Sequence, residues 1–160
     1  MNRIWSPWRS EYIGADKPQT CILCDAPSKG PGSGFHVLFD GSVSLVMLNK
    51  YPYTGGHLMI APLRHVANLE ELSPEESIDL FRLMRVSTAA LTSAFKPDGF
   101  NVGMNIGTAA GAGIDDHIHM HVVPRWEGDT NFMPVLSDTK VLSQHLDETF
   151  KRLKPLFERI

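Results

Sequence analysis

The sequence predicts an α+β fold, with a mainly antiparallel sheet of about five strands, one central helix and one C-terminal helix. Short apolar segments follow one another in the first half of the chain with turn residues between them, which is typical of strands joined by hairpins. A single long amphipathic segment then separates these strands from two further ones. A parallel, doubly wound sheet is disfavoured, because it needs more helices than the central and the C-terminal helix predicted here.

Three strands are predicted before the central helix, over residues 35–40, 42–48 and 57–62. The dipeptide Asp40-Gly41 is a turn signal between the first two strands. The eight residues 49–56, N-K-Y-P-Y-T-G-G, are rich in turn formers and predict a loop before the third strand.

The central helix is predicted to begin after Ser73. Ser73 is a suitable N-cap, Pro74 fits the first turn, and Glu76 completes a capping box. The sequence K-P-D-G at residues 96–99 ends the helix. Its expected buried stripe consists of Ile78, Leu80, Phe81, Met84, Leu91 and Phe95.

Two more strands are predicted at residues 100–106 and 117–123, and a second amphipathic helix at about residues 140–158. Pro155 is expected to bend or end this helix, because proline has no backbone N–H to donate. The length of 160 residues predicts one domain. We expect an irregular N-terminal segment at residues 1–34, a core at 35–132 and a C-terminal helical segment at 138–160.

The composition is that of an ordinary globular protein, with 42% apolar and 21% charged residues. A formal net charge of −3 gives no reason to expect nucleic acid or an anionic membrane as a partner. No apolar run approaches the roughly 20 residues of a membrane span. The first residues lack the apolar centre of a secretory signal, so the expected location is cytoplasmic.

Three histidines alternate with apolar residues in H-I-H-M-H-V-V, residues 117–123. Because side chains alternate faces along a strand, His117, His119 and His121 are expected on one face, and the residues between them on the core face. Histidine is a nucleophile, a general acid or base, or a metal ligand. The segment therefore predicts a reactive or metal-binding site.

The loop before these histidines, G-T-A-A-G-A-G at residues 107–113, has no bulky side chain and is far longer than a hairpin needs. Exposed backbone N–H groups in such a loop form a cradle for an anion. An anion cradle beside histidines points to phosphoryl or nucleotidyl transfer.

Cys21 and Cys24 are the two cysteines of the chain, in C-I-L-C. In a reducing compartment this spacing is typical of half a metal site, since zinc takes four ligands. A thioredoxin-like redox pair and two unpaired surface cysteines are the alternatives.

These residues resemble a known family. H-I-H-M-H-V-V matches the histidine triad pattern at all seven positions, and L-N-K-Y-P-Y-T-G-G-H-L-M-I-A-P resembles the ribose-side strand and loop of that family. The opening R-I-W-S-P-W-R-S-E-Y-I and the trailing V-P-R-W-E-G-D-T-N-F look like the branch of fragile histidine triad hydrolases and bacterial dinucleoside polyphosphate phosphorylases. The resemblance covers about residues 21–132 and implies the histidine triad fold.

The resemblance implies a covalent nucleotidyl-histidine mechanism. In it, His119 is the nucleophile, His121 contacts the leaving-group oxygens and delivers a proton, and His57 lies near the phosphates. The nucleotide is bound by Asn49, Asn105, Gly107, Thr108, Gly111, Gly113 and His121. The sequence departs from the family at Gly113-Ile114, where many members have Gly-Gln-Ser or Gly-Gln-Thr, so the phosphate-contacting hydroxyl is missing here unless Thr108 replaces it.

The resemblance also implies a structural zinc site and a homodimer built through the central helix and a shared sheet. Some triad proteins hold zinc with a CxxC pair, a later histidine and the first triad histidine, which here are Cys21, Cys24, His65 and His117.

Dinucleoside polyphosphates are the implied substrates, with water or phosphate as second nucleophile, and no organic cofactor is needed. The alternatives are a purine nucleoside phosphoramidase, a non-catalytic nucleotide-binding module, and a three-histidine metallohydrolase. Residues i to i+4 of a strand span about 13 Å, which disfavours the last.

Overall fold

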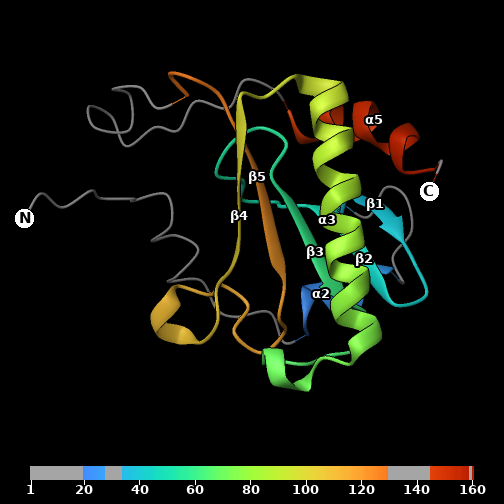
Figure 1. Ribbon diagram of the computed structural model, residues 1–160, viewed down its shortest axis with the longest axis vertical. Helices are drawn as coiled ribbons and strands as arrows, with labels where there is room; N and C mark the ends of the chain where they lie inside the picture. Colours follow the sequence, from blue (N-terminus) through green and yellow to red (C-terminus); the bar gives the residue numbers. More distant parts are fainter. Residues whose placement is uncertain (1–19, 28–33, 130–144, 159) are drawn as a thin grey trace, which may run out of the picture.

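A five-stranded antiparallel sheet forms the centre of the molecule in a computed structural model, which describes residues 20–27, 34–129, 145–158 and 160 (Figure 1). Its strands are β1 (Val37–Asp40), β2 (Ser44–Leu48), β3 (Leu58–Pro62), β4 (Gly99–Met104) and β5 (Met120–Arg125). The order across the sheet is β1-β2-β3-β5-β4. The predicted α+β class is thus confirmed, and the last strand of the sequence lies between β3 and β4.

Helix α3 (Pro74–Phe95) lies along one face of this sheet (Figure 1). The predicted capping box is present, because Glu76 N–H donates to Ser73 Oγ at 3.1 Å and Ser73 N–H donates to Glu76 Oε2 at 2.7 Å. The helix ends at Lys96, which adopts a left-handed conformation with φ 49°. Both ends therefore follow the local signals in the sequence.

Four of the six residues predicted for the buried stripe of α3 pack in the main core cluster, Leu80 and Leu91 fully buried and Met84 and Phe95 partly buried, but the other two do not. Ile78 and Phe81 are 70% and 60% exposed, although both are large and apolar. The buried stripe of α3 contains three leucines and three small residues: Leu80, Leu83, Ser87, Ala90, Leu91 and Ala94. At about 3.6 residues per turn, positions 78 and 81 lie away from this stripe, so Ile78 and Phe81 are on a face directed away from the core.

Helix α5 (Leu146–Phe157) packs against β1 and α3, with Leu153 and Phe157 buried in the core. The sequence predicts that Pro155 bends or ends the helix, and the second of these effects is excluded because α5 continues through Pro155 to Phe157. In the last turn proline removes only one helical hydrogen bond, and burial of Phe157 offsets that cost. Residues 140–144 of the predicted helix lie outside the described residues.

The opposite face of the sheet is covered by the N-terminal part of the described chain. Alternate residues of β2 pack in two separate clusters, Val46 and Leu48 on the α3 side and Leu45 and Met47 on the other. A short helix, α2 (Ile22–Asp25), contributes fully buried Leu23 to the second cluster. The segment predicted to be irregular thus holds one helical turn, which brings its two cysteines close to the sheet.

Two short 3₁₀ helices, η2 (Leu69–Glu71) and η3 (Thr108–Ala110), were not predicted. Figure 1 shows α2, η2, η3 and the start of β5 at the same end of the long axis. Among the residues that the structure describes, no helix is long and apolar enough to cross a membrane.

Candidate active site and metal centre

The histidine segment enters the sheet later than predicted. β5 begins at Met120, and Ile118 N–H donates outside the strand ladder, to Val66 O at 2.7 Å. His117 and His119 therefore precede the strand, and His121 lies within it, opposite Met59 and Gly103. Met120 and Val122 pack in the main core cluster, as the alternation predicts.

The ring of His119 is held by the main chain of its own segment. Its Nδ1 lies 2.9 Å from the backbone carbonyl oxygen of His117, which can only accept, so Nδ1 carries the hydrogen. In the neutral ring, Nε2 then carries the lone pair. Burial lowers the pKa of His119, and the hydrogen bond to His117 offsets only part of this effect. The side chain is thus a neutral imidazole near pH 7 with its lone pair on Nε2, which is the form that a nucleophilic histidine requires.

His57 and His121 complete a cluster of three neighbouring imidazoles. His57 Nε2 lies 3.0 Å from His121 Nδ1, and the centroids of the His119 and His121 rings are 4.8 Å apart. His57 is fully buried, and the ring of Tyr53 stacks on it at a centroid distance of 4.7 Å. The structure therefore brings together the three residues that the sequence nominates for catalysis.

The predicted nucleotide-binding residues lie in two loops. Asn49 begins the β2–β3 loop, and its Nδ2 lies 3.4 Å from His57 Nδ1. Asn105 Nδ2 donates to Gly111 O at 3.5 Å, so Asn105 contacts the glycine-rich loop. Within that loop Gly107, Thr108, Gly111 and Gly113 are exposed, and Thr108 begins η3. Their backbone N–H groups and the Thr108 hydroxyl are of the kind that binds phosphate.

Cys21, Cys24, His65 and His117 form a compact group of four ligand atoms, all within 4.8 Å of one another. The Cys24 Sγ atom lies 3.2 Å from His65 Nδ1 and 3.4 Å from His117 Nδ1, and Cys21 Sγ lies 3.3 Å from His117 Nδ1. Tetrahedral zinc with ordinary bond lengths places sulfur and nitrogen ligands about 3.6 Å apart. Two thiols and two imidazoles at these distances fit such an ion.

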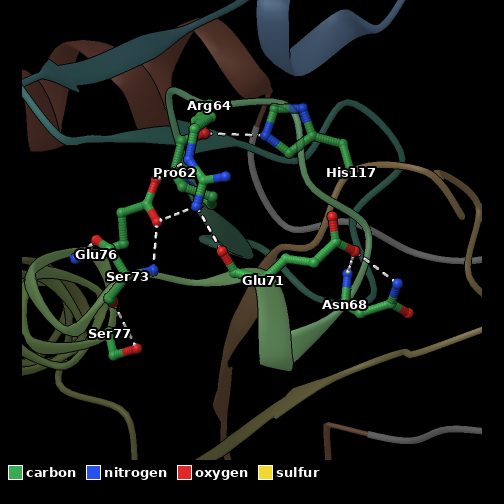
Figure 2. Close-up of polar contacts among 8 residues, drawn as sticks. All are labelled: Pro62, Arg64, Asn68, Glu71, Ser73, Glu76, Ser77 and His117. Carbon is green, nitrogen blue, oxygen red and sulfur yellow. Dashed lines mark hydrogen bonds and ion pairs between the residues drawn. The ribbon is translucent and has the colours of Figure 1, made fainter.

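The two histidines of this group are oriented by further contacts. His117 Nε2–H donates to Pro62 O at 2.9 Å (Figure 2), and His65 Nε2 lies 3.6 Å from Asp116 Oδ2. Such outer contacts commonly fix the tautomer of a metal-binding histidine. With Nδ1 beside the cysteines and Nε2 bound to Pro62, His117 has no nitrogen left for a site shared with His119 and His121. These contacts disfavour the three-histidine metallohydrolase.

The segment that carries His65 is fixed to α3 by an ion pair. Arg64 Nε and Nη2 donate to the two carboxylate oxygens of Glu76 at 3.0 and 2.7 Å, and Arg64 Nη2 also donates to Glu71 O (Figure 2). Glu76 thus caps its own helix and holds Arg64 at the same time. The end of β3, which supplies Pro62 O, and the segment after it, which carries His65, are thus tied to α3.

Without a bound cation, the thiol of Cys24 keeps its proton near neutral pH. Burial and the neighbouring Cys21 raise the pKa of Cys24 to about 11, because a thiolate there is poorly solvated and lies beside a second sulfur. A bound dication reverses this balance, since it stabilises both thiolates directly.

Several residues of the site were missed in the sequence. Tyr53 stacks on His57 and donates its backbone N–H to His57 Nδ1 at 3.1 Å, and Asp116 lies beside His65. The position of Tyr53, four residues before His57 in a turn-rich loop, was the only available signal for it. The carbonyl groups of Pro62 and His117 leave no signal, because every residue has one.

Comparison with known proteins agrees with these observations. Residues 34–128 match the HIT domain family. The AP-4-A phosphorylase of Mycobacterium tuberculosis (strain CDC 1551 / Oshkosh) is 35% identical over 161 residues, which cover 96% of this chain and 83% of that protein. The asymmetrical bis(5'-nucleosyl)-tetraphosphatase of Schizosaccharomyces pombe is 31% identical over 96 residues, or 60% of this chain and 52% of that protein.

A solved structure shares the same fold. The crystal structure of a Zn-bound histidine triad family protein from Mycobacterium smegmatis has a TM-score of 0.69 and 25% identity to this chain. The match covers 88% of this chain and 94% of that one. Together with the histidine segment and the five-stranded sheet, these matches show that the chain belongs to the histidine triad (HIT) family.

Proposed function

We propose that the protein is a dinucleoside polyphosphate phosphorylase, which transfers a nucleotidyl group through His119. The observation that carries this proposal is the buried, neutral imidazole of His119, whose Nδ1–H is bound by the His117 carbonyl so that Nε2 holds the lone pair. A nucleophile of this kind lies 4.8 Å, centroid to centroid, from a second imidazole, that of His121. This pair suits displacement at phosphorus.

The reaction proceeds in two displacements. His119 Nε2 forms a bond to the α-phosphorus, the bond from that phosphorus to the bridging oxygen breaks, and the rest of the substrate leaves with that oxygen, as ATP in the case of diadenosine tetraphosphate, while the AMP group stays on His119. Inorganic phosphate then attacks the nucleotidyl-histidine, the P–N bond breaks, and a nucleoside diphosphate is released. His121 contacts the oxygens at the scissile bond. Two easier steps thus replace one difficult step.

Phosphate rather than water is the proposed second nucleophile. The relative named a phosphorylase matches 96% of this chain, whereas the relative named a tetraphosphatase matches 60%.

Binding of the nucleotide falls to Asn49 and Asn105 and to the exposed loop that carries Gly107, Thr108, Gly111 and Gly113. The loop offers backbone N–H groups to the phosphates.

A structural zinc ion is part of the proposal, held by Cys21, Cys24, His65 and His117. The compact ligand group and its hydrogen bonds to Pro62 and Asp116 support it, as does the Zn-bound relative from M. smegmatis. A closed site of four protein ligands is typical of structural rather than catalytic zinc. The zinc would attach α2 to the start of the histidine segment.

We also propose a homodimer. Ile78 and Phe81 are exposed on α3 beside Arg82 and Arg85, and Val102 is exposed on β4, which lies at the edge of the sheet. Large apolar side chains on an exposed helix face, together with a strand at the edge of the described sheet, are suited to pairing with a second copy.

The test is a product analysis. The purified protein is incubated with diadenosine tetraphosphate and, separately, with an adenosine phosphoramidate, each with and without inorganic phosphate. We expect ADP and ATP from the first substrate, only when phosphate is present. AMP without phosphate would indicate a hydrolase, preferential cleavage of the phosphoramidate would indicate a phosphoramidase, and nucleotide binding without turnover a non-catalytic module. Each of these three outcomes contradicts the proposal.

A further inference from the structure

The hydrogen positions on the clustered imidazoles follow from partners whose donor or acceptor role is fixed. A backbone N–H can only donate, and that of Tyr53 points to His57 Nδ1 at 3.1 Å. Asn49 Nδ2, also a donor, lies 3.4 Å from the same nitrogen. The orientation of the Asn49 amide is fixed, because its Oδ1 accepts Tyr51 N–H at 2.9 Å. His57 Nδ1 therefore accepts and carries no hydrogen.

This assignment determines the next ring as well. The neutral His57 ring holds its hydrogen on Nε2 and donates it to His121 Nδ1 at 3.0 Å. His121 then carries its own hydrogen on Nε2. In the neighbouring His119 ring the order is reversed, with the hydrogen on Nδ1 and the lone pair on Nε2. A lone pair and an N–H donor are thus presented by adjacent rings of the same cluster.

We propose that Tyr53 and Asn49 are positioning residues, which set the tautomer of His57 and, through it, the hydrogen that His121 offers to a phosphate oxygen. The role in catalysis rests on the proposed function. The Tyr53 ring supports the same arrangement, because it stacks on His57 at an interplanar angle of 28° and lies 5.9 Å from the His121 ring.

The loop that carries both residues is itself well anchored. Asn49 N–H donates to His57 O at 2.9 Å, and His57 N–H donates to Thr54 O at 3.3 Å. The Thr54 hydroxyl donates to Pro124 O at 2.9 Å, which ties the loop to β5, the strand of His121. These hydrogen bonds hold the loop in place, and with it the two donors that contact His57 Nδ1.

The first test is spectroscopic and needs no substrate. Long-range ¹⁵N–¹H correlation spectra of the ¹⁵N-labelled, zinc-supplemented protein distinguish the two neutral tautomers of each histidine, with single His→Gln variants for assignment. We expect the hydrogen of His57 and His121 on Nε2 and that of His119 on Nδ1. A His57 ring with its hydrogen on Nδ1 would overturn the proposal. A protein with the expected tautomers but no phosphorylase activity would refute the proposed function alone.

The second test replaces the Asn49 amide, a hydrogen-bond donor to His57 Nδ1, with a carboxylate of similar shape, which can only accept. Asn49→Asp places a carboxylate oxygen near His57 Nδ1, so we expect a hydrogen to appear on that nitrogen and kcat to fall by about 10²-fold. A change in KM with an unaltered His57 spectrum would mean that Asn49 only binds nucleotide, and the role assigned to it would be wrong.

Tyr53 is tested by removal of its ring. Tyr53→Ala should lower kcat by about 10-fold and broaden the His57 ring signals, because the stacking partner is lost. Tyr53→Phe, which keeps the ring and the backbone N–H, is the matched rescue and should restore both. Equal kcat values in the wild type and the alanine variant would overturn the role of the ring.

Discussion

The backbone carbonyl of His117 accepts the ring Nδ1–H of His119 at 2.9 Å, while the His117 side chain lies within 3.4 Å of both cysteine sulfurs. One residue thus belongs to the candidate metal centre by its side chain and orients the candidate nucleophile by its main chain. The two sites are adjacent parts of a single structure. A disturbance of the metal ligands is therefore expected to reach His119.

Replacement of the candidate nucleophile should separate chemistry from binding. His119→Ala is expected to lower kcat by more than about 10³-fold, because no other group can form the covalent intermediate. Nucleotide affinity, measured by calorimetry, should change by less than about 10-fold, since the loops proposed to bind the nucleotide are retained. His145→Asn is the control: this exposed histidine accepts a hydrogen bond at the start of α5, and asparagine preserves that role. Turnover of His119→Ala near the wild-type rate would contradict the mechanism.

Loss of one sulfur ligand should remove the metal and weaken catalysis indirectly. Cys24→Ser is expected to lose most of its zinc in elemental analysis, and kcat should fall by about 10-fold or more through the displaced His117. Asp25→Asn, in the same short helix, is the control and should retain zinc. A Cys24→Ser protein with a full equivalent of zinc would show that the four residues do not form the site.

The ion pair between Arg64 and Glu76 predicts a specific pH dependence of stability. The hydrogen bonds from Arg64, followed by those from Ser73, outweigh burial and lower the pKa of Glu76 from 4.5 to about 2. Because the folded state then binds fewer protons than the unfolded state, this contribution is complete above about pH 4.5 and is lost as the pH falls towards 2.

Glu76→Gln should therefore lower the free energy of unfolding at pH 7 by about 1.5–3 kcal/mol and flatten its decline below pH 4.5. Urea unfolding measured from pH 7 to pH 3 checks both effects. Glu75→Gln, at the neighbouring exposed position of the same turn, is the matched control and should leave the curve unchanged. Identical curves for Glu76→Gln and the wild type would mean that the ion pair contributes no net stability.

The exposed apolar residues of α3 predict an effect on assembly. The double variant Ile78→Ser and Phe81→Ser should halve the molar mass measured by light scattering, while its thermal stability stays similar to that of the dissociated wild type. Leu69→Ser removes an apolar side chain that is 46% exposed outside α3, and it should leave the mass unchanged. A wild type that is monomeric at all tested concentrations would refute the dimer.

Gly56 is required by the close approach of the β2–β3 loop to α3. Its φ is +82°, and an added Cβ would lie 3.1 Å from Leu91 Cδ2 and 3.3 Å from Pro124 Cγ. We expect Gly56→Ala to lower stability by about 1–3 kcal/mol, from backbone strain and overpacking together. Gly99→Ala, where nothing lies within 4 Å of the added Cβ, should change it by less than about 0.5 kcal/mol in the same denaturation assay.

The sequence by itself determined the features that depend on local signals. Ser73 and Glu76 specify where α3 begins through contacts within one helical turn, and the alternation of Met120 and Val122 specifies which face of β5 meets the core. The candidate site residues were also found in this way, because three histidines and a CxxC pair are unusual enough to indicate chemistry without coordinates.

Only the tertiary structure decided which nitrogen of each histidine is available, where β5 inserts in the sheet, and which face of α3 is buried. These features depend on contacts between residues far apart in the chain, such as His117 with Pro62 O and Ile118 with Val66 O. The partners are backbone groups that every residue possesses, so no sequence pattern marks them. The exposure of Ile78 and Phe81 has the same origin, since hydrophobicity predicts burial against a partner but does not identify the partner.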